Sequence, residues 1–345
     1  MPEKPRLTRL QMALARGGLV LALIIIIFLL FVPIYVTIYG DPLDNGKKIP
    51  LYQGILAIAF FWIPVLFIGW VAAGAWWGER KKERDRRVER EQKLNQRKKY
   101  ILKREVELKG QRLSLNRQER LQKLSPLYRK LPEELKFKLE EHIILFQEIV
   151  EFKKWRIEEV TEIMRDIVSV DACLLIINRG LLDYLYLDFV EIWGTPIRLM
   201  HSENEMAGQA RPSQVRLTWD SVEFSNYDGG DNFNVTLHEF AHVLDFTDDK
   251  IANSIPVSRD SPEHSKWKSL LDREYPKLQE AYQRHQAHVL DDYAITDPNR
   301  AEFFSCATES FFERSAELKK SNPEIYSLFQ NFYKLDPASW KNSGI

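Results

Sequence analysis

Residues 229–242 read GGDNFNVTLHEFAH, and this stretch decides the fold class. Its two glycines predict a turn, after which Asp231 or Asn232 can cap a helix that continues through Asp245. The apolar residues around the two histidines indicate that one face of this helix packs against a core. We therefore expect a buried helix that carries two histidines and a glutamate.

This helix has the spacing of a zinc site. Residues four apart project from one helix face, so His238 and His242 can bind one zinc ion through their imidazole nitrogens. Glu239 lies about 100° further round the helix, where it can act as general base on a water that the metal activates. The alternative is a surface helix with two ordinary histidines, which the apolar flanks disfavour.

A catalytic zinc needs a third protein ligand and an open position. No histidine follows His242 at the spacing of the metzincins, because position 248 is an aspartate. A better candidate lies on a helix predicted over residues 299–312, where Glu302, Cys306 and Glu309 share one face among phenylalanines. Glu302 is the preferred ligand because an acidic residue in an apolar helix needs a partner, and Glu309 is the competing assignment.

Two nearby residues have open roles. Cys306, one helical turn after Glu302, is either a small buried residue against the motif helix or a ligand, and the first interpretation is favoured because Glu302 already completes the set. Asp245 can orient a ligand histidine or cap a neighbouring loop, and so can be a residue of the second shell.

Charge divides the chain of 345 residues into three parts. The formal net charge is zero, yet residues 1–78 carry 6 basic and 3 acidic side chains, residues 79–125 carry 18 and 8, and the remainder is acidic. We expect a transmembrane hairpin over 1–78, a charged helical linker over 79–123 and a metallopeptidase domain over 124–345. The composition excludes a wholly disordered chain. The two cysteines exclude a disulfide-dense scaffold and a four-cysteine zinc site.

The predicted hairpin consists of two uncharged helices at about 17–39 and 50–77. Basic residues precede the first and follow the second, which places both termini and the peptidase domain in the cytoplasm, below the inner membrane. The lipid bilayer is then a partner of the chain.

The linker over 79–123 has a helix-favouring composition and a net charge of +10 over 79–125. This charge could bind nucleic acid, but anionic lipid headgroups beside the predicted spans are the preferred partner, so no direct nucleic-acid binding is expected. Apolar residues recur every seven positions without the second position of a coiled-coil seam, so self-association is possible but not specified. These residues are Leu94, Ile101, Leu108 and Leu115.

The C-terminal part predicts an α+β domain. Residues 133–151 and 157–170 have helical patterns. Three short alternating stretches, 190–193, 197–199 and 215–219, predict strands.

Beyond the motif, residues 124–340 resemble the Mlc titration factor A family of zinc metallopeptidases. The resemblance rests on the helix from His238 to Asp245, on residues 292–294 and on residues 301–304 with Glu309. It implies a zincin-like fold of the gluzincin type. It also implies specific roles: His238, His242 and Glu302 as metal ligands, Glu239 as base, and Tyr293 as the group that stabilises the oxyanion.

The predicted function is a membrane-anchored peptidase that hydrolyses peptide or protein substrates with one Zn²⁺ per chain. The alternative is a non-catalytic membrane tether that sequesters a cytoplasmic transcription regulator, since a soluble member of the resembling family binds a repressor. A third possibility is an oligomeric scaffold. Glu239 and Tyr293 favour catalysis because metal retention requires neither.

Overall fold

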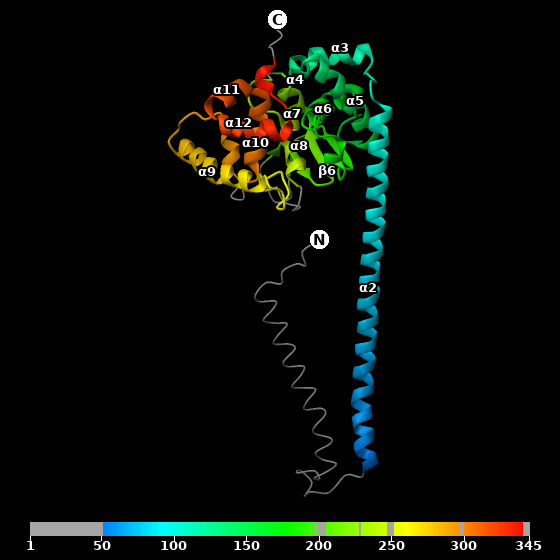
Figure 1. Ribbon diagram of the computed structural model, residues 1–345. Coiled ribbons are helices and arrows are strands. Elements are labelled where there is room, and N and C mark those ends of the chain that lie inside the picture. The colour runs from blue at the N-terminus through cyan, green and yellow to red at the C-terminus, as the bar shows by residue number, and fades with distance from the viewer. Residues whose placement is uncertain are drawn as a thin grey trace. The chain divides into compact units, whose positions relative to one another are not determined.

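The computed structural model describes residues 51–195, 197–198, 205–227, 229–246, 252–296 and 300–340. It divides into two compact units, Met1–Arg90 and Glu91–Ile345 (Figure 1). The predicted first apolar helix, 17–39, lies outside the described residues.

Helix α2 (Leu51–Glu107) corrects the prediction for the second apolar stretch. It does not end near residue 77 but continues through the charged sequence as one helix of 57 residues, with Pro64 inside it. Among the residues that the structure describes, no helix is long and apolar enough to cross a bilayer. The predicted localisation in the inner membrane with two spans is therefore wrong: residues 51–77 are not a separate apolar helix but the start of a helix whose second half is strongly charged.

Residues 91–124 belong to the second compact unit. After α2 ends, Gly110 adopts a left-handed conformation (φ 83°), and α3 (Leu115–Leu124) follows. Ile101 and Leu108 of the predicted self-association stripe are 0% and 2% exposed in the unit's own core. The compact unit thus begins before residue 124, where the sequence predicted the domain to start.

Two small sheets lie in this unit. The larger has the order β1-β2-β6-β5, with β1, β2 and β6 parallel and β5 antiparallel at its edge. Its strands are Glu151–Trp155, Phe189–Trp193, Gln214–Thr218 and Gly208–Arg211, respectively. The smaller pairs β3 (Ile197–Arg198) with β4 (Glu205–Met206). The α+β class is confirmed, and the predicted strands near 190 and 215 correspond to β2 and β6.

The other helices of the unit pack on one another and, in the case of α5, α7 and α8, on the strands (Figure 1). They are α4 (Pro126–Lys130), α5 (Glu133–Ile149), α6 (Glu162–Leu174), α7 (Trp219–Ser225), α8 (Val235–Asp245), α9 (His264–Gln283), α10 (Glu302–Glu313), α11 (Ser315–Ser321) and α12 (Pro323–Tyr333). Short 3₁₀ helices are η1 (Leu181–Tyr184), η2 (Asp292–Ile295) and η3 (Pro337–Ser339). Asp297 and Pro298 precede α10 in the sequence and favour a helix start there, but both lie outside the described residues.

Helices α8 and α10 lie side by side at the centre of the unit (Figure 1). On one side, Phe240 of α8 packs edge-on against Phe146 and Tyr184, with ring centroids 5.8 and 5.4 Å apart. On the other side, Phe304 of α10 packs against Phe329, at 5.3 Å. Buried aromatic contacts of this kind stabilise a core beyond the area they bury, so both helices are held on rigid apolar surfaces.

Candidate metal centre

Helix α8 carries the motif, and Asn234 caps its N-terminus. The Asn234 side chain accepts a hydrogen bond of 2.9 Å from the amide of Leu237. The sequence had indicated Asp231 or Asn232 for this role, but Asn232 is in a left-handed conformation (φ 71°) that turns the chain before the helix begins. An asparagine directly before the first helical residue was the signal that could have identified the cap.

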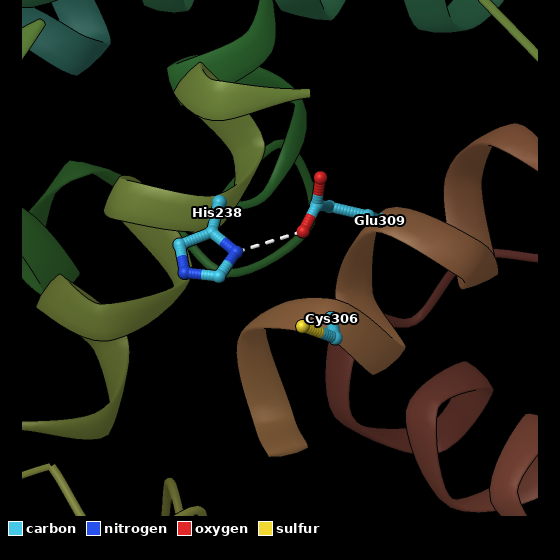
Figure 2. A group of neighbouring side chains, drawn as sticks. All are labelled: His238, Cys306 and Glu309. Atoms are coloured by element: carbon cyan, nitrogen blue, oxygen red, sulfur yellow. Dashed lines mark hydrogen bonds and ion pairs between the residues drawn. The ribbon is translucent and has the colours of Figure 1, made fainter. Parts of the chain in front are cut away.

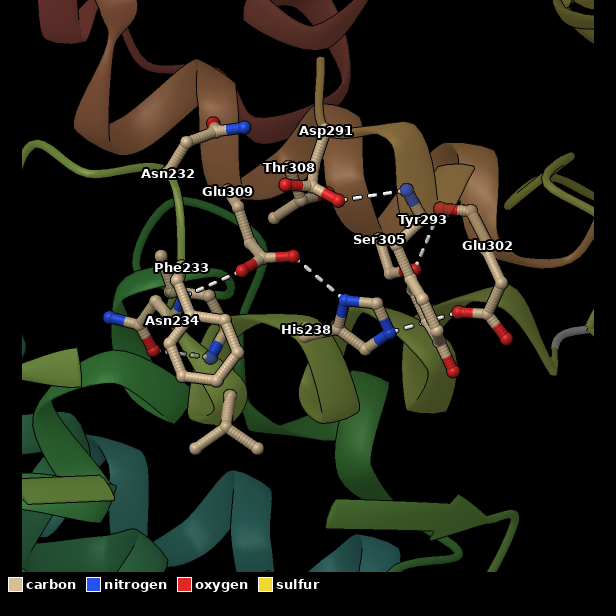
Figure 3. Close-up of polar contacts among 12 residues, drawn as sticks. Asn232, Phe233, Asn234, His238, Asp291, Tyr293, Glu302, Ser305, Thr308 and Glu309 are labelled. Carbon is tan, nitrogen blue, oxygen red and sulfur yellow. Dashed lines mark hydrogen bonds and ion pairs between the residues drawn. The ribbon is translucent and has the colours of Figure 1, made fainter. Parts of the chain in front are cut away.

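The structure brings three of the predicted site residues together between α8 and α10. The Nε2 atoms of His238 and His242 lie 3.2 Å apart, and Oε2 of Glu302 lies 2.9 Å from the first and 3.1 Å from the second. Figure 3 shows His238 between Glu302 on one side and Glu309 on the other. One ligand atom from each of the three residues falls within 4.8 Å of the others, which is a geometry that can hold a metal ion.

The donor set fits zinc. Tetrahedral zinc with bonds of about 2.0–2.1 Å to nitrogen and oxygen holds its ligand atoms about 3.3 Å from one another, and the three distances here are close to that value. Two ring nitrogens and a carboxylate oxygen that converge in this way also repel unless a proton or a cation lies among them. His238, His242 and Glu302 therefore form a site that would accept a zinc ion.

The electrostatics of the centre also favour a bound cation. Burial would lower the pKa of His238, but the charge of Glu309 and the hydrogen bonds of the ring to Cys306 and Glu302 raise it well above its usual value. Burial likewise opposes ionisation of Glu302, yet its hydrogen bonds with His238 and His242 hold the pKa of its carboxyl below the usual range. The centre therefore favours a negative carboxylate beside positive charge.

Glu309 contacts the other nitrogen of His238. Its Oε1 lies 2.7 Å from Nδ1, and its Oε2 accepts a bond of 2.6 Å from the amide of Asn234 (Figure 3). A carboxylate on Nδ1 fixes the ring so that Nε2 faces the metal position. Glu309 is thus turned away from the Nε2 atoms that Glu302 contacts, and it is 4% exposed.

Cys306 lies beside the same histidine, one turn before Glu309 on α10 (Figure 2). With His238 and Glu309 it forms a second group whose ligand atoms lie within 4.8 Å. The thiol is 1% exposed, and burial raises its pKa to about 12. Because the thiolate is the form that binds metals, a neutral buried thiol behaves here as a small packed residue.

Glu239 faces a cavity of about 460 Å³ that His238, His242, Glu302 and Tyr293 also line. Burial raises the pKa of its carboxyl, while the neighbouring histidines partly offset this. The carboxylate lies against Gly208 of edge strand β5, where an added Cβ would come 2.6 Å from Cγ and Oε1 of Glu239. Only glycine leaves room for the glutamate, and nothing near Gly208 in the sequence signals this contact.

Tyr293 stands at the rim of the cavity on η2. Its ring centroid lies 5.7 Å from that of His238, and it is 48% exposed. The side chain of Asp291 caps η2 by accepting a bond of 2.8 Å from the Tyr293 amide (Figure 3). Burial and the charge of Glu302 raise the pKa of the phenol, so it is a neutral hydroxyl that can donate a hydrogen bond.

Two further carboxyls behind the centre had not been predicted as functional. Asp171 is fully buried and accepts a bond of 3.2 Å from the side chain of Asn234. Glu313 is 7% exposed and accepts a bond of 3.1 Å from the amide of Asn232. Burial raises their pKa values to about 7 and about 9. They tie the segment before α8 to α6 and α10.

Comparison with known proteins agrees with this geometry. Residues 94–334 match the family model of the glucose-regulated metallo-peptidase M90. A Synechocystis protein without assigned function is 28% identical over 61% of this chain and 81% of its own length. Mlc titration factor A of Pectobacterium atrosepticum is 32% identical over 44% of this chain and 59% of that protein, and the Yersinia pestis protein of the same name is 29% identical over 44% and 58%. The chain therefore spans under two thirds of the titration factors that it matches.

Proposed function

The chain belongs to the M90 family of glucose-regulated metallopeptidases, and from this premise we propose that it is a zinc-dependent peptidase. In this proposal His238, His242 and Glu302 bind one zinc ion, Glu239 is the general base and Tyr293 is the oxyanion donor. The convergence of two Nε2 atoms and one carboxylate oxygen within 3.2 Å of one another is the observation that supports it best.

Zinc, when bound, would polarise the scissile carbonyl and lower the pKa of water. The residues of the chain would do the rest. Glu239, with its raised pKa in the wall of the cavity, is suited to accept a proton from water and deliver it to the leaving amine. A carboxylate whose pKa is raised above that of an ordinary glutamate accepts a proton from water more readily.

Tyr293 would stabilise the oxyanion that develops on the attacked carbonyl. A neutral phenol at the cavity rim can donate a hydrogen bond to that oxygen. This bond is strongest in the transition state, where the oxygen carries the most negative charge. Its position on η2 is fixed by the bond from its amide to Asp291.

Edge strand β5, which forms one wall of the cavity, could bind an extended peptide substrate. This strand ends the order β1-β2-β6-β5, so in the sheet as described one side of its backbone pairs with no strand. Gly208, Gln209 and Ala210 line the cavity. An edge strand beside a reactive centre offers backbone hydrogen bonds to a substrate whatever its side chains are, which supports peptides as the substrate class.

A second candidate is the binding of a transcription regulator, Mlc in particular, because the relatives are named Mlc titration factor A. Binding alone would not require a glutamate of raised pKa inside the cavity. The two functions are separable by experiment, since loss of the base would stop hydrolysis and leave binding intact.

The test is peptide cleavage and zinc content of the full chain with Glu239→Gln. The substitution keeps the shape and all three proposed ligands, so zinc should remain, while turnover should fall by about 10² to 10⁴. Glu134→Gln makes the same chemical change at an exposed position of α5 and should cleave like wild type. Equal cleavage by Glu239→Gln and wild type would end the enzyme proposal, and regulator binding would then be the function to measure.

A further inference from the structure

Asp245 is a buried carboxylate near the centre, and among the described residues its hydrogen bonds go to loop amides and not to either histidine. It ends α8, three residues after His242, and is 2% exposed. Its Oδ2 accepts bonds of 2.7 Å from the amide of Asn253 and 2.6 Å from the amide of Ser254. Of the two roles that the sequence left open, these contacts are those of a loop cap.

The loop that Asp245 contacts includes Ser254, a buried serine with an unusual backbone conformation. Ser254 is 1% exposed and has a left-handed backbone (φ 61°), a conformation that a residue other than glycine adopts at some cost. The two bonds to Asp245 hold this conformation. Burial raises the pKa of Asp245 to about 6, and the amides of Ser254 and Asn253 oppose that rise, so the carboxylate is mostly ionised at neutral pH.

The Ser254 hydroxyl caps α10 from a distance of 50 residues along the chain. Its Oγ accepts a bond of 2.8 Å from the amide of Phe304, the third residue of the helix, and donates one of 2.6 Å to the carbonyl of Arg300. Ala301 stands at the N-cap position and has no side chain that can cap. Ser254 therefore caps the N-terminus of α10, a role that a serine directly before the helix usually has.

We propose that Asp245 and Ser254 are positioning residues for the metal centre, which set the place of Glu302 relative to His238 and His242. Glu302 is the first residue of α10, so it lies within the turn that Ser254 caps. Asp245 is on the same helix as both histidines. The chain of contacts from α8 through Asp245 and Ser254 to α10 is thus a direct link between the two sets of ligands.

The inference rests on the proposed function, because it assumes that Glu302 is a metal ligand. Removal of the Ser254 hydroxyl would leave the Phe304 amide and the Arg300 carbonyl without this partner in a buried place. The first turn of α10 would then shift or fray, and the Glu302 carboxylate with it. Loss of a group that orients a metal ligand weakens metal binding about 10- to 100-fold.

The experiment measures the zinc dissociation constant of the folded full chain by competition with a chelating indicator. Ser254→Ala should weaken zinc binding about ten-fold or more, and Asp245→Ala should do the same. Asp245→Asn keeps an oxygen that can accept from both amides and should recover most of the affinity. The double variant should lose less zinc affinity than the sum of the two single losses, because both residues act through the same chain of contacts.

Ser169→Ala is the matched control for a merely structural role. Ser169 is a fully buried serine of α6 with a hydroxyl bond of 2.6 Å to Arg165, away from the centre. The Ser169→Ala variant should be less stable than wild type, and its zinc affinity should be unchanged. Ser254→Gly removes the hydroxyl while easing the left-handed backbone, so it replaces Ser254→Ala if that variant does not fold.

A loss of zinc affinity in the Ser254 variants no larger than in Ser169→Ala would overturn the inference. His242→Ala distinguishes this result from failure of the proposed function. If His242→Ala binds zinc as wild type does, the ligand assignment itself is wrong. If His242→Ala loses zinc and Ser254→Ala does not, only the positioning role is wrong.

Discussion

The two ends of helix α8 each meet a buried carboxylate, and the two carboxylates act on different targets. At the N-terminal end, Glu309 of α10 contacts the Nδ1 atom of His238 and the amide of Asn234. At the C-terminal end, Asp245 of α8 accepts hydrogen bonds from two backbone amides of a loop, and that loop caps α10. Both carboxylates are buried, and they differ in their hydrogen-bond partners, which give each one a different role.

This difference separates two requirements of a metal centre. The N-terminal end fixes the orientation of a ring, whereas the C-terminal end fixes the position of a helix that carries a ligand. A substitution at the N-terminal end should disturb the ring of His238, whereas a substitution at the C-terminal end should displace the whole side chain of Glu302. The predictions below act on the two ends separately.

Glu309→Gln should have the largest effect at the N-terminal end. The amide keeps the size of the side chain but removes the charge that faces His238, so we expect zinc binding to weaken about 10- to 100-fold. Competition with a chelating indicator measures this. Glu140→Gln, which alters a buried carboxylate bonded to Arg112, is the control and should leave zinc affinity unchanged. An unchanged affinity in Glu309→Gln would mean that the ring needs no such partner.

Asn234→Ala should lower stability rather than metal affinity. It removes the cap of α8 and the partner of Asp171, while the backbone amide that contacts Glu309 remains. We expect the free energy of unfolding to fall by about 1–2 kcal/mol, measured by denaturant titration. Thr161→Ala removes the equivalent cap of α6 and should cost about 1 kcal/mol. A strong loss of zinc in Asn234→Ala would show that the cap acts on the ring as well.

The two ends should also differ in pH dependence. The pKa of Glu313 at the N-terminal end is raised to about 9, first by burial and then by the charge of Glu309, whereas that of Asp245 is raised to about 6. A folded state that holds a proton longer than the unfolded state loses stability as pH rises between the two pKa values. Of these two carboxyls, only Glu313 still contributes between pH 7 and 8, with a slope of at most about 1.4 kcal/mol per pH unit.

Glu313→Gln should therefore flatten the decline of stability between pH 7 and 8, and Asp245→Asn should not. Thermal unfolding of the full chain across this range measures the slope. An equal slope in wild type and Glu313→Gln would show that Glu313 does not hold a proton in the folded state.

The parts of the site that lie close together in the sequence could be predicted from it. The spacing of His238 and His242 and the end of α8 at Asp245 follow from helical periodicity, which needs only neighbouring residues. The strands near 190 and 215 were likewise visible as alternating patterns. Glu302 was found because a charge in an apolar helix requires an explanation.

The remaining features depend on contacts between distant segments. Ser254 caps a helix 50 residues further on, and Gly208 makes room for a glutamate 31 residues away. The sequence next to either residue contains no signal of these contacts. Residues 51–77 were misjudged for a related reason: an apolar stretch does not show where its helix ends, and α2 continues to Glu107.

The zinc content of the purified full chain, compared among wild type, Glu302→Ala and Glu309→Ala, tests the central claim most directly. After equilibration at a free zinc concentration well above the weakened dissociation constant expected for Glu309→Ala, we expect one zinc per chain in wild type and nearly as much in Glu309→Ala, because Glu309 orients His238 and is not itself a ligand. Glu302→Ala should retain far less, since it loses the carboxylate oxygen that faces both Nε2 atoms. Zinc retained by Glu302→Ala and lost by Glu309→Ala would contradict the account.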